Sequence, residues 1–388
     1  MTRDLRLVAL SLLIWGFGEG MFIYFQPLYI GELGANPAEI GGILGLAAFG
    51  MMVSHLPAGA LADYVGRKTL MVASWALGAI AAGMMALARG LPLFVAGLVL
   101  YSFTAFVMSP MSSYITQARG AWSPARALTT VTAGFSAGAI LGPVFGGQWA
   151  EEFGLRSVYV MATGIFVIST VLILLIRPQP IEPAHDGHRY GALLGNRPLG
   201  GFLVLVFLVN FAMYLAWPLT PNYLQDVHAV SVSQIGLLAA FTGLGVVVFN
   251  LALGRLQAKR GLLIGQALVA GAALALWQGK GLGLFAAGYF LFAGFRTSRS
   301  LITAAIHGLV DPAELGLAFG ANEAVASASM MAAAPVAGLL FARSPELPYP
   351  VGIGLIALGL LLCAAFAPST QVEIEPEPPS ERGVVGGA

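Results

Sequence analysis

The feature that most constrains this chain is a series of long apolar segments. Twelve of them can be laid along its 388 residues without overlap, each long enough to cross a bilayer as a helix of roughly 20 residues. The 19 Lys and Arg with 18 Asp and Glu are too few to cover a water-soluble fold of this length. The sequence therefore predicts an all-α integral membrane protein, with spanning helices near 5–30, 40–62, 69–89, 91–116, 126–150, 156–177, 199–225, 233–256, 261–280, 282–309, 315–343 and 347–367.

The charge balance and the single cysteine exclude several classes of function. A net charge of +1 without a run of Lys or Arg gives no basic field for nucleic acid. Cys363 has no partner for an intramolecular disulfide, and its apolar neighbours favour a packing role. The spans carry no His/Asp/Glu cluster or serine–histidine arrangement suited to catalysis, and no spacing typical of a metal site. We expect no enzyme, metal, cofactor or nucleic-acid partner.

The distribution of Lys and Arg predicts the orientation, because these residues are retained on the cytoplasmic side. With both termini inside, the cytoplasmic segments hold 13 of the 19, the outer loops hold 4, and two lie within the tenth span. This bias predicts a multi-pass protein of the cell (inner) membrane with both termini cytoplasmic. We expect it to be a monomer surrounded by membrane lipid.

A polar interruption between the sixth and seventh spans divides the chain into two halves. We expect an N-terminal six-helix bundle at 1–177, a cytoplasmic linker at 178–198 and a C-terminal six-helix bundle at 199–367. Residues 368–388 carry four glutamates among prolines, a composition that predicts a disordered acidic cytoplasmic tail.

Local matches at one offset predict that the two halves are repeats of each other. Three matches recur at an offset of 192 to 195 residues, which is hard to obtain by chance. The pairs are 59–66 with 254–261, Pro143 with Pro335, and Pro27 with Pro221. Two pseudo-symmetric bundles related by a parallel repeat would place a substrate site between them, near the bilayer midplane.

The loop between the second and third spans carries the most specific motif. Its pattern is Gly59-x-Leu61-Ala62-Asp63-x-x-Gly66-Arg67-Lys68. This pattern resembles the signature loop of the major facilitator superfamily, and the resemblance covers essentially the whole chain. It implies a transporter that works by alternating access, in which Gly59, Asp63, Gly66, Arg67 and Lys68 form a cytoplasmic gating motif. The alternative is that these residues only fix topology and loop shape. The second copy has Ala258 in place of Asp63, so we expect the lock in the first half alone.

The fifth span carries a second motif, formed by Gly138, Gly142, Pro143, Gly146 and Gly147. It resembles the antiporter motif of drug:proton exporters in this superfamily, which favours export over uptake. The alternative is a helix that bends at its proline and packs closely through its glycines, without a role in coupling.

Glu19 is the strongest candidate in the first half, because a charge within the hydrocarbon is costly and suggests function. It lies roughly 21 Å from the cytoplasmic end of its predicted helix, near the middle of the membrane. Trp15, Phe22 and Gln26 share its helical face and would line the substrate cavity. We expect Glu19 to carry a proton or to face a cationic substrate; the alternative is a structural hydrogen bond.

Two arginines in the tenth span and a glutamate in the eleventh are the candidates in the second half. Arg296 and Arg299 lie three residues apart, and Glu323 follows Asn322 at a similar expected depth. We expect Arg296, Arg299 and Asn322 to line the substrate cavity. Glu323 is a second candidate for proton coupling, or else forms a structural ion pair with Arg299. Two arginines against one glutamate leave a spare positive charge, which keeps anionic and zwitterionic amphiphiles among the possible substrates.

A polar face in the seventh span completes the predicted cavity. Asn210, Tyr214 and Trp217 recur at i, i+4 and i+7 and would face Glu19. One departure from the family pattern weakens the case for proton coupling. Many proton-coupled exporters have an arginine inside the fourth helix, whereas 91–116 contains none, and Arg296 is a candidate substitute.

Together these observations predict a secondary transporter that exports small amphiphilic molecules, driven by a proton gradient. Two alternatives remain open at this stage. One is a symporter or facilitator for a polar or anionic metabolite, anchored by Arg296 and Arg299. The other is a lipid or glycolipid flippase with the same fold.

Overall fold

The structure is a computed structural model of the full chain. It describes residues 1–55, 65–180, 195–253, 256–311 and 314–367. The predictions for Gly59, Asp63, most of the linker and the acidic tail fall outside these described residues.

The described parts of the first half consist of helices joined by short connections. These are α1 (Arg3–Ile23), α2 (Gln26–Glu32), α3 (Pro37–His55), α5 (Arg67–Leu87), α6 (Leu91–Phe103), the 3₁₀ helix η1 (Thr104–Val107), α7 (Met108–Gln117), α8 (Pro124–Phe153) and α9 (Leu155–Leu174).

The second half repeats this arrangement. Its helices are α11 (Arg197–Tyr214), α12 (Thr220–His228), α13 (Val232–Leu253), α14 (Ala258–Gln278), α15 (Leu282–Ile306), α16 (Leu315–Arg343) and α17 (Pro348–Phe366).

Eleven helical segments of the described chain are long and apolar enough to cross a membrane, with α6, η1 and α7 forming one of them. The predicted tenth span corresponds to α15, which has 25 residues but is made less apolar by Arg296 and Arg299. The all-α membrane fold is therefore confirmed, and each of the twelve predicted spans contains helix among its described residues.

Two predicted spans are each broken into two helices. The first is divided at Tyr24 and Phe25 between α1 and α2, and the seventh is divided over residues 215–219 between α11 and α12. Both second helices have a proline in their first turn. A proline is tolerated there because the first N–H groups of a helix have no partner within it, but the same residue cannot donate the hydrogen bond that would continue a preceding helix. The prediction of a single helical face over 15–26 or 210–217 is therefore wrong, because each face crosses a break.

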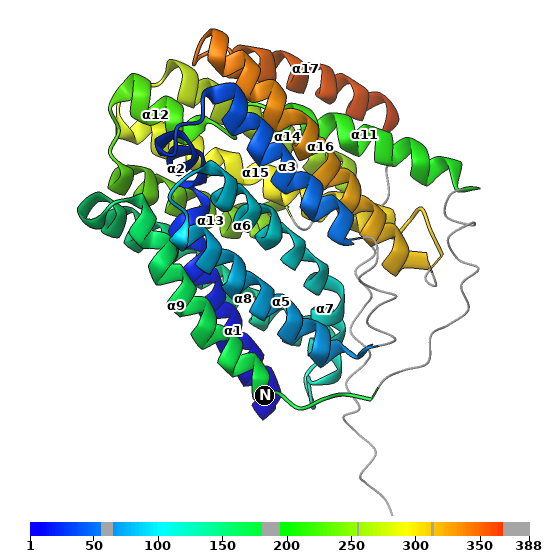
Figure 1. Ribbon diagram of the computed structural model, residues 1–388. Helices are drawn as coiled ribbons and strands as arrows, with labels where there is room; N and C mark the ends of the chain where they lie inside the picture. Colours follow the sequence, from blue (N-terminus) through cyan, green and yellow to red (C-terminus); the bar gives the residue numbers. More distant parts are fainter. Residues whose placement is uncertain (56–64, 181–194, 254–255, 312–313, 368–388) are drawn as a thin grey trace, which may run out of the picture.

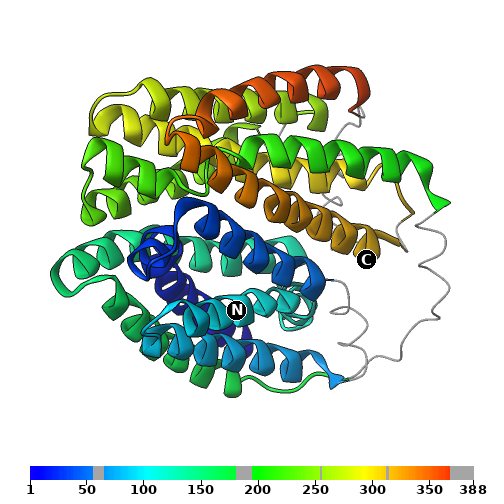
Figure 2. The same ribbon diagram turned by 45° about the horizontal axis from the view of Figure 1, so that its top comes forward.

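The helices form two bundles that pack against each other mainly through two pairs of helices. Figure 2 shows the first half, in blue to green, below the second half, in green to red. The α3 helix packs along α16, and α8 packs along α13. We call the side at which α1 begins and α3 ends the termini side, and the side holding α2 and α12 the opposite side (Figure 1).

Candidate functional site

Glu19 lies half-buried on α1 and is held by two neutral hydrogen-bonding partners. The side chains of Trp15 and Tyr101 donate hydrogen bonds to its carboxyl group. Trp15 is itself fixed, because its ring stacks on Phe166 with the centroids 4.1 Å apart. The carboxyl group is therefore positioned by the aromatic core of the first half, with part of its surface still accessible.

The α1 helix packs closely against α8, and this packing explains the glycine motif of α8. Gly138, Gly142 and Gly146 recur every four residues and face the backbone of α1. A methyl group at any of them would overlap a backbone carbonyl oxygen of that helix. Small residues at such positions let two helices approach closely. These glycines thus act in the fold as the alternative interpretation predicted, by letting two helices pack closely.

Arg296 is the charge that faces Glu19 from the other half. Its side chain is exposed, and its charge acts on both Glu19 and Tyr24. Tyr24 also interacts electrostatically with Glu19. The structure therefore brings together the two charged candidates, one from α1 and one from α15. Sequence analysis missed Tyr24, because a continuous helix would turn it away from the Glu19 face, and the chain leaves the helix after Ile23.

An aromatic stack lies one helical turn from Arg296 in the second half, because Phe292 precedes Arg296 by four residues on α15. The rings of Trp217 and Phe292 are parallel, with centroids 3.5 Å apart. Trp217 also contacts Tyr289 edge-on at 5.0 Å, and Tyr214 contacts Phe295 at 5.8 Å. Trp217 reaches this stack from the turn after α11, so the predicted residue is present although the predicted helical face is not.

Arg299 and Glu323 form an ion pair between α15 and α16, as one of the two sequence interpretations expected. Their side chains are 25% and 36% exposed. His55, at the end of α3 in the first half, interacts electrostatically with both. These three charged or titratable groups lie where the two halves meet on the termini side. Sequence analysis did not identify His55, because a single histidine has no distinctive spacing.

The remaining predicted cavity residues are buried. Phe22 packs inside the first bundle against Tyr101, Tyr159 and Phe166, with no exposed surface. Gln26, Asn210 and Asn322 are also buried, and each has a side-chain amide atom without a hydrogen-bond partner among the described residues. Their assignment to the cavity stays a prediction.

Part of the gating motif lies at the start of α5. Gly66 precedes this helix with φ at +82°, a backbone conformation that favours glycine. Arg67 and Lys68 are the first two residues of the helix, and Arg67 donates a hydrogen bond to Gln179 Oε1 at 3.5 Å. The motif arginine therefore contacts the start of the segment that joins the two halves.

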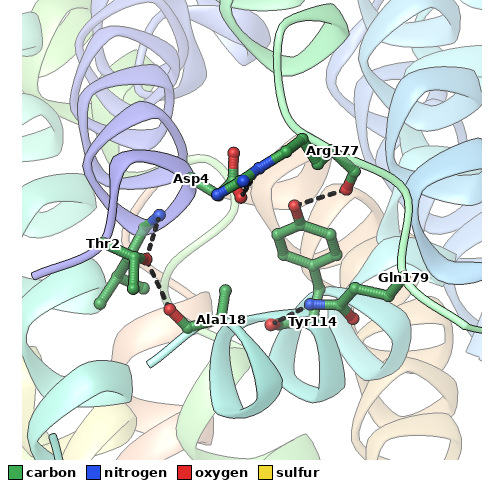
Figure 3. Close-up of polar contacts among 7 residues, drawn as sticks. Thr2, Asp4, Tyr114, Ala118, Arg177 and Gln179 are labelled. Carbon is green, nitrogen blue, oxygen red and sulfur yellow. Dashed lines mark hydrogen bonds and ion pairs between the residues drawn. The ribbon is translucent and has the colours of Figure 1, made fainter. Parts of the chain in front are cut away.

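Figure 3 shows a polar network that sequence analysis missed, around the same segment. Thr2 Oγ1 donates a hydrogen bond to the Ala118 carbonyl oxygen (2.6 Å), and Arg177 Nε donates one to Asp4 Oδ2 (2.9 Å). Tyr114 Oη donates to the Arg177 carbonyl oxygen (2.8 Å). Gln179 Nε2 donates to the Tyr114 carbonyl oxygen (3.0 Å). The network ties the beginning of α1, the end of α7 and the residues after α9 together on the termini side.

On the opposite side, hydrogen bonds link the two halves. Glu151 at the end of α8 accepts hydrogen bonds from the Ser233 backbone N–H at 2.9 Å and from Ser231 Oγ at 3.0 Å. Asn222 Nδ2 donates to the Pro27 carbonyl oxygen at 3.4 Å.

Glycines complete this contact surface. Gly147 of α8 meets Gly236 of α13, and Gly41 of α3 meets Gly338 of α16. A Cβ atom at Gly147 would lie 2.9 Å from the Val232 carbonyl oxygen, so the backbones are in direct contact. The two halves are thus closely joined on the opposite side, through hydrogen bonds and glycine contacts alike.

Comparisons with known proteins agree with this architecture. The sequence model of the Major Facilitator Superfamily matches residues 8–203 and again residues 202–386. Among solved structures, the nucleoside transporter NupG superposes with a TM-score of 0.77 at 15% identity, covering 94% of this chain and 98% of that chain. The human organic anion transporter MFSD10 (TETRAN) superposes with a TM-score of 0.67 at 16% identity, covering 93% and 99%. These likenesses concern the fold.

Two similar sequences carry names that refer to drug resistance. The multi-drug resistance efflux pump PmrA homolog of Lactococcus lactis subsp. lactis is 25% identical over 272 residues, which is 67% of each chain. The multidrug resistance protein MdtG of Serratia proteamaculans is 26% identical over 279 residues, covering 67% of this chain and 66% of that protein.

Proposed function

This chain belongs to the major facilitator superfamily, a family of membrane transporters and not of enzymes, and we propose that it exports small amphiphilic compounds in exchange for protons. The similarity to two proteins named for multidrug efflux or resistance supports both the direction and the substrate class. The observation that carries the proposal is the half-buried carboxyl group of Glu19, which faces the charge of Arg296 across the boundary between the halves.

Glu19 serves as the main site of proton exchange in this proposal. A carboxylate can neutralise a cationic group on the substrate, and the same carboxyl group loses that attraction when it takes up a proton. Proton binding and substrate binding therefore compete at one group, which is the requirement for exchange. Trp15 and Tyr101 hold the carboxyl group in place through both steps. Glu323, paired with Arg299, is the second candidate for proton coupling.

The contacts between the halves support alternating access around this site. We assign the termini side to the cytoplasm, in the cell membrane, because most of the Lys and Arg residues then lie inside. The opposite side, joined by Glu151 and by the meeting of Gly147 with Gly236, is the outer gate, closed in this conformation. The gating motif that includes Asp63 and Arg67 is the inner gate in this proposal.

Accumulation of a fluorescent lipophilic cation in efflux-deficient bacteria tests the proposal. Cells that express the wild-type protein should accumulate less dye than cells with an empty vector, and a protonophore should remove the difference. Glu19→Gln should accumulate as much dye as the empty vector at equal protein abundance. Arg89→Gln is the matched control, because this exposed arginine lies outside the site. Equal accumulation in wild-type and empty-vector cells would reject export.

A further inference from the structure

Among the described candidates for the site, Glu19 and Arg296 are two accessible charges of opposite sign that lie on opposite halves of the protein. Glu19 comes from α1 and Arg296 from α15, and each acts electrostatically on the other. The two other charges of the predicted site are already paired, because Arg299 and Glu323 form an ion pair with each other. The site therefore offers a substrate one anionic and one cationic anchor.

Neither anchor has a close partner of opposite charge. The Glu19 carboxyl group is hydrogen-bonded by Trp15 and Tyr101, which are neutral and leave its charge uncompensated except by Arg296. The Arg296 side chain is exposed, and no hydrogen bond to it is seen in the described part of the chain. A guanidinium group binds a carboxylate through two parallel hydrogen bonds, a geometry that a distant electrostatic partner does not supply.

A substrate with a single charge would pair with one anchor and leave the charge of the other anchor without a counter-charge. A cation that pairs with Glu19 removes the counter-charge that Arg296 had, and an anion at Arg296 does the same to Glu19. Leaving a charge uncompensated away from bulk water is costly. A substrate with both charges pairs with both groups and leaves neither alone.

We propose that the site selects small aromatic zwitterions, with a cationic amine at Glu19 and a carboxylate at Arg296. This inference rests on the proposed function and names its substrate class. Aromatic side chains lie near each anchor: Trp15 and Tyr101 hydrogen-bond Glu19, and Phe292, which stacks on the half-buried Trp217, lies one helical turn from Arg296 on α15. A delocalised cation also gains from aromatic faces. Because the anchors lie on different halves, such a substrate bridges the halves that must move in transport.

The bound zwitterion remains exchangeable for a proton. A proton taken up by Glu19 neutralises the carboxylate and releases the amine, while the carboxylate of the substrate stays at Arg296 as its single attachment. Tyr24 also interacts electrostatically with both Glu19 and Arg296. The proton replaces one of two ionic contacts, so the affinity for the zwitterion should fall as Glu19 is protonated.

Three xanthene dyes with nearly the same body test the selection by charge. Rhodamine 110 carries a cationic xanthene and a free carboxylate, rhodamine 123 is its cationic methyl ester, and fluorescein is anionic. Binding to the purified full chain is measured by fluorescence polarisation at neutral pH. The wild-type protein should bind rhodamine 110 about tenfold more tightly than either of the other dyes, as a second charge-assisted pair predicts.

Two variants should reduce that preference in different ways. Arg296→Gln should bring rhodamine 110 down to the affinity of rhodamine 123 and leave rhodamine 123 unchanged or tighter. Glu19→Gln should bring rhodamine 110 down to the affinity of fluorescein. Arg296→Lys, which keeps the charge, should retain part of the preference, and Arg89→Gln should retain all of it. The ratio of two dye affinities within one variant does not depend on the fraction of protein that is folded.

The outcomes separate this inference from the proposed function. Equal affinity of the wild-type protein for the three dyes, or a preference that survives both Arg296→Gln and Glu19→Gln, overturns the zwitterion site. If vesicles containing the protein still move rhodamine 123 under a pH gradient, export by proton exchange stands without it. If none of the dyes is moved under a pH gradient, the proposed function itself fails.

Discussion

Replacing Gly236 by alanine should open the opposite side of the protein. A Cβ atom at Gly236 would overlap the carbonyl oxygen of Pro143 and lie 3.2 Å from the Gly147 Cα atom. Both neighbours are backbone of α8, which cannot move aside as a flexible side chain can. Such overpacking costs about 1–3 kcal/mol, and this cost applies only while the halves are joined on this side. The equilibrium should therefore shift toward the state open here by about 5- to 150-fold.

A cysteine at Ser231 reports this change. Its half-buried hydroxyl group donates a hydrogen bond to Glu151 in the joined state, so the position should become more accessible when the halves separate. The labelling rate of Ser231→Cys by a polar maleimide should rise in the Gly236→Ala background, in purified protein. Cys363 is buried and adds little background. Gly164→Ala is the control, because a Cβ atom there has nothing within 4 Å. An unchanged labelling rate would refute the idea that these glycines seal the two halves.

Three further changes test separate parts of the structure by the shift in thermal unfolding of the purified protein. Glu323→Gln should cost less than about 1 kcal/mol, because its ion pair with Arg299 is partly exposed, and a loss of several kcal/mol would show that the pair is more buried than described. Asp4→Asn should cost about 1 kcal/mol by weakening the 2.9 Å contact with Arg177, and an unchanged midpoint would argue against the network. Gly66→Ala should cost about 1–3 kcal/mol, because its φ of +82° with ψ of 147° disfavours a side chain, and a stabilised protein would contradict that geometry.

The sequence was most informative where one physical constraint acts along many residues. The membrane requires long apolar helices, so the positions of the spans could be predicted from hydropathy alone. Close packing between α1 and α8 requires small residues every fourth position, so Gly138, Gly142 and Gly146 were visible as a motif. An ionisable group in an apolar span is rare enough to single out Glu19 and Arg296 without a structure.

Features that depend on where a helix breaks, or on segments far apart in the chain, could not be predicted in the same way. Tyr24 lies at the break after Ile23 and interacts electrostatically with Arg296, and hydropathy does not report such a break because the chain stays apolar across it. The contact of Asp4 with Arg177 joins residues 173 positions apart, and neither has a distinctive spacing. His55 likewise gains its neighbours only through the packing of α3 against α16.

The most direct test of the account is whether protons move through Glu19 when substrate moves. The purified protein is reconstituted into vesicles that contain a pH-sensitive dye, and a cationic substrate such as rhodamine 123 is added outside without a pH gradient. The account predicts that entry of rhodamine 123 drives protons out through the wild-type protein, and that Glu19→Gln abolishes this proton movement. Proton movement of equal size in Glu19→Gln would contradict the central claim.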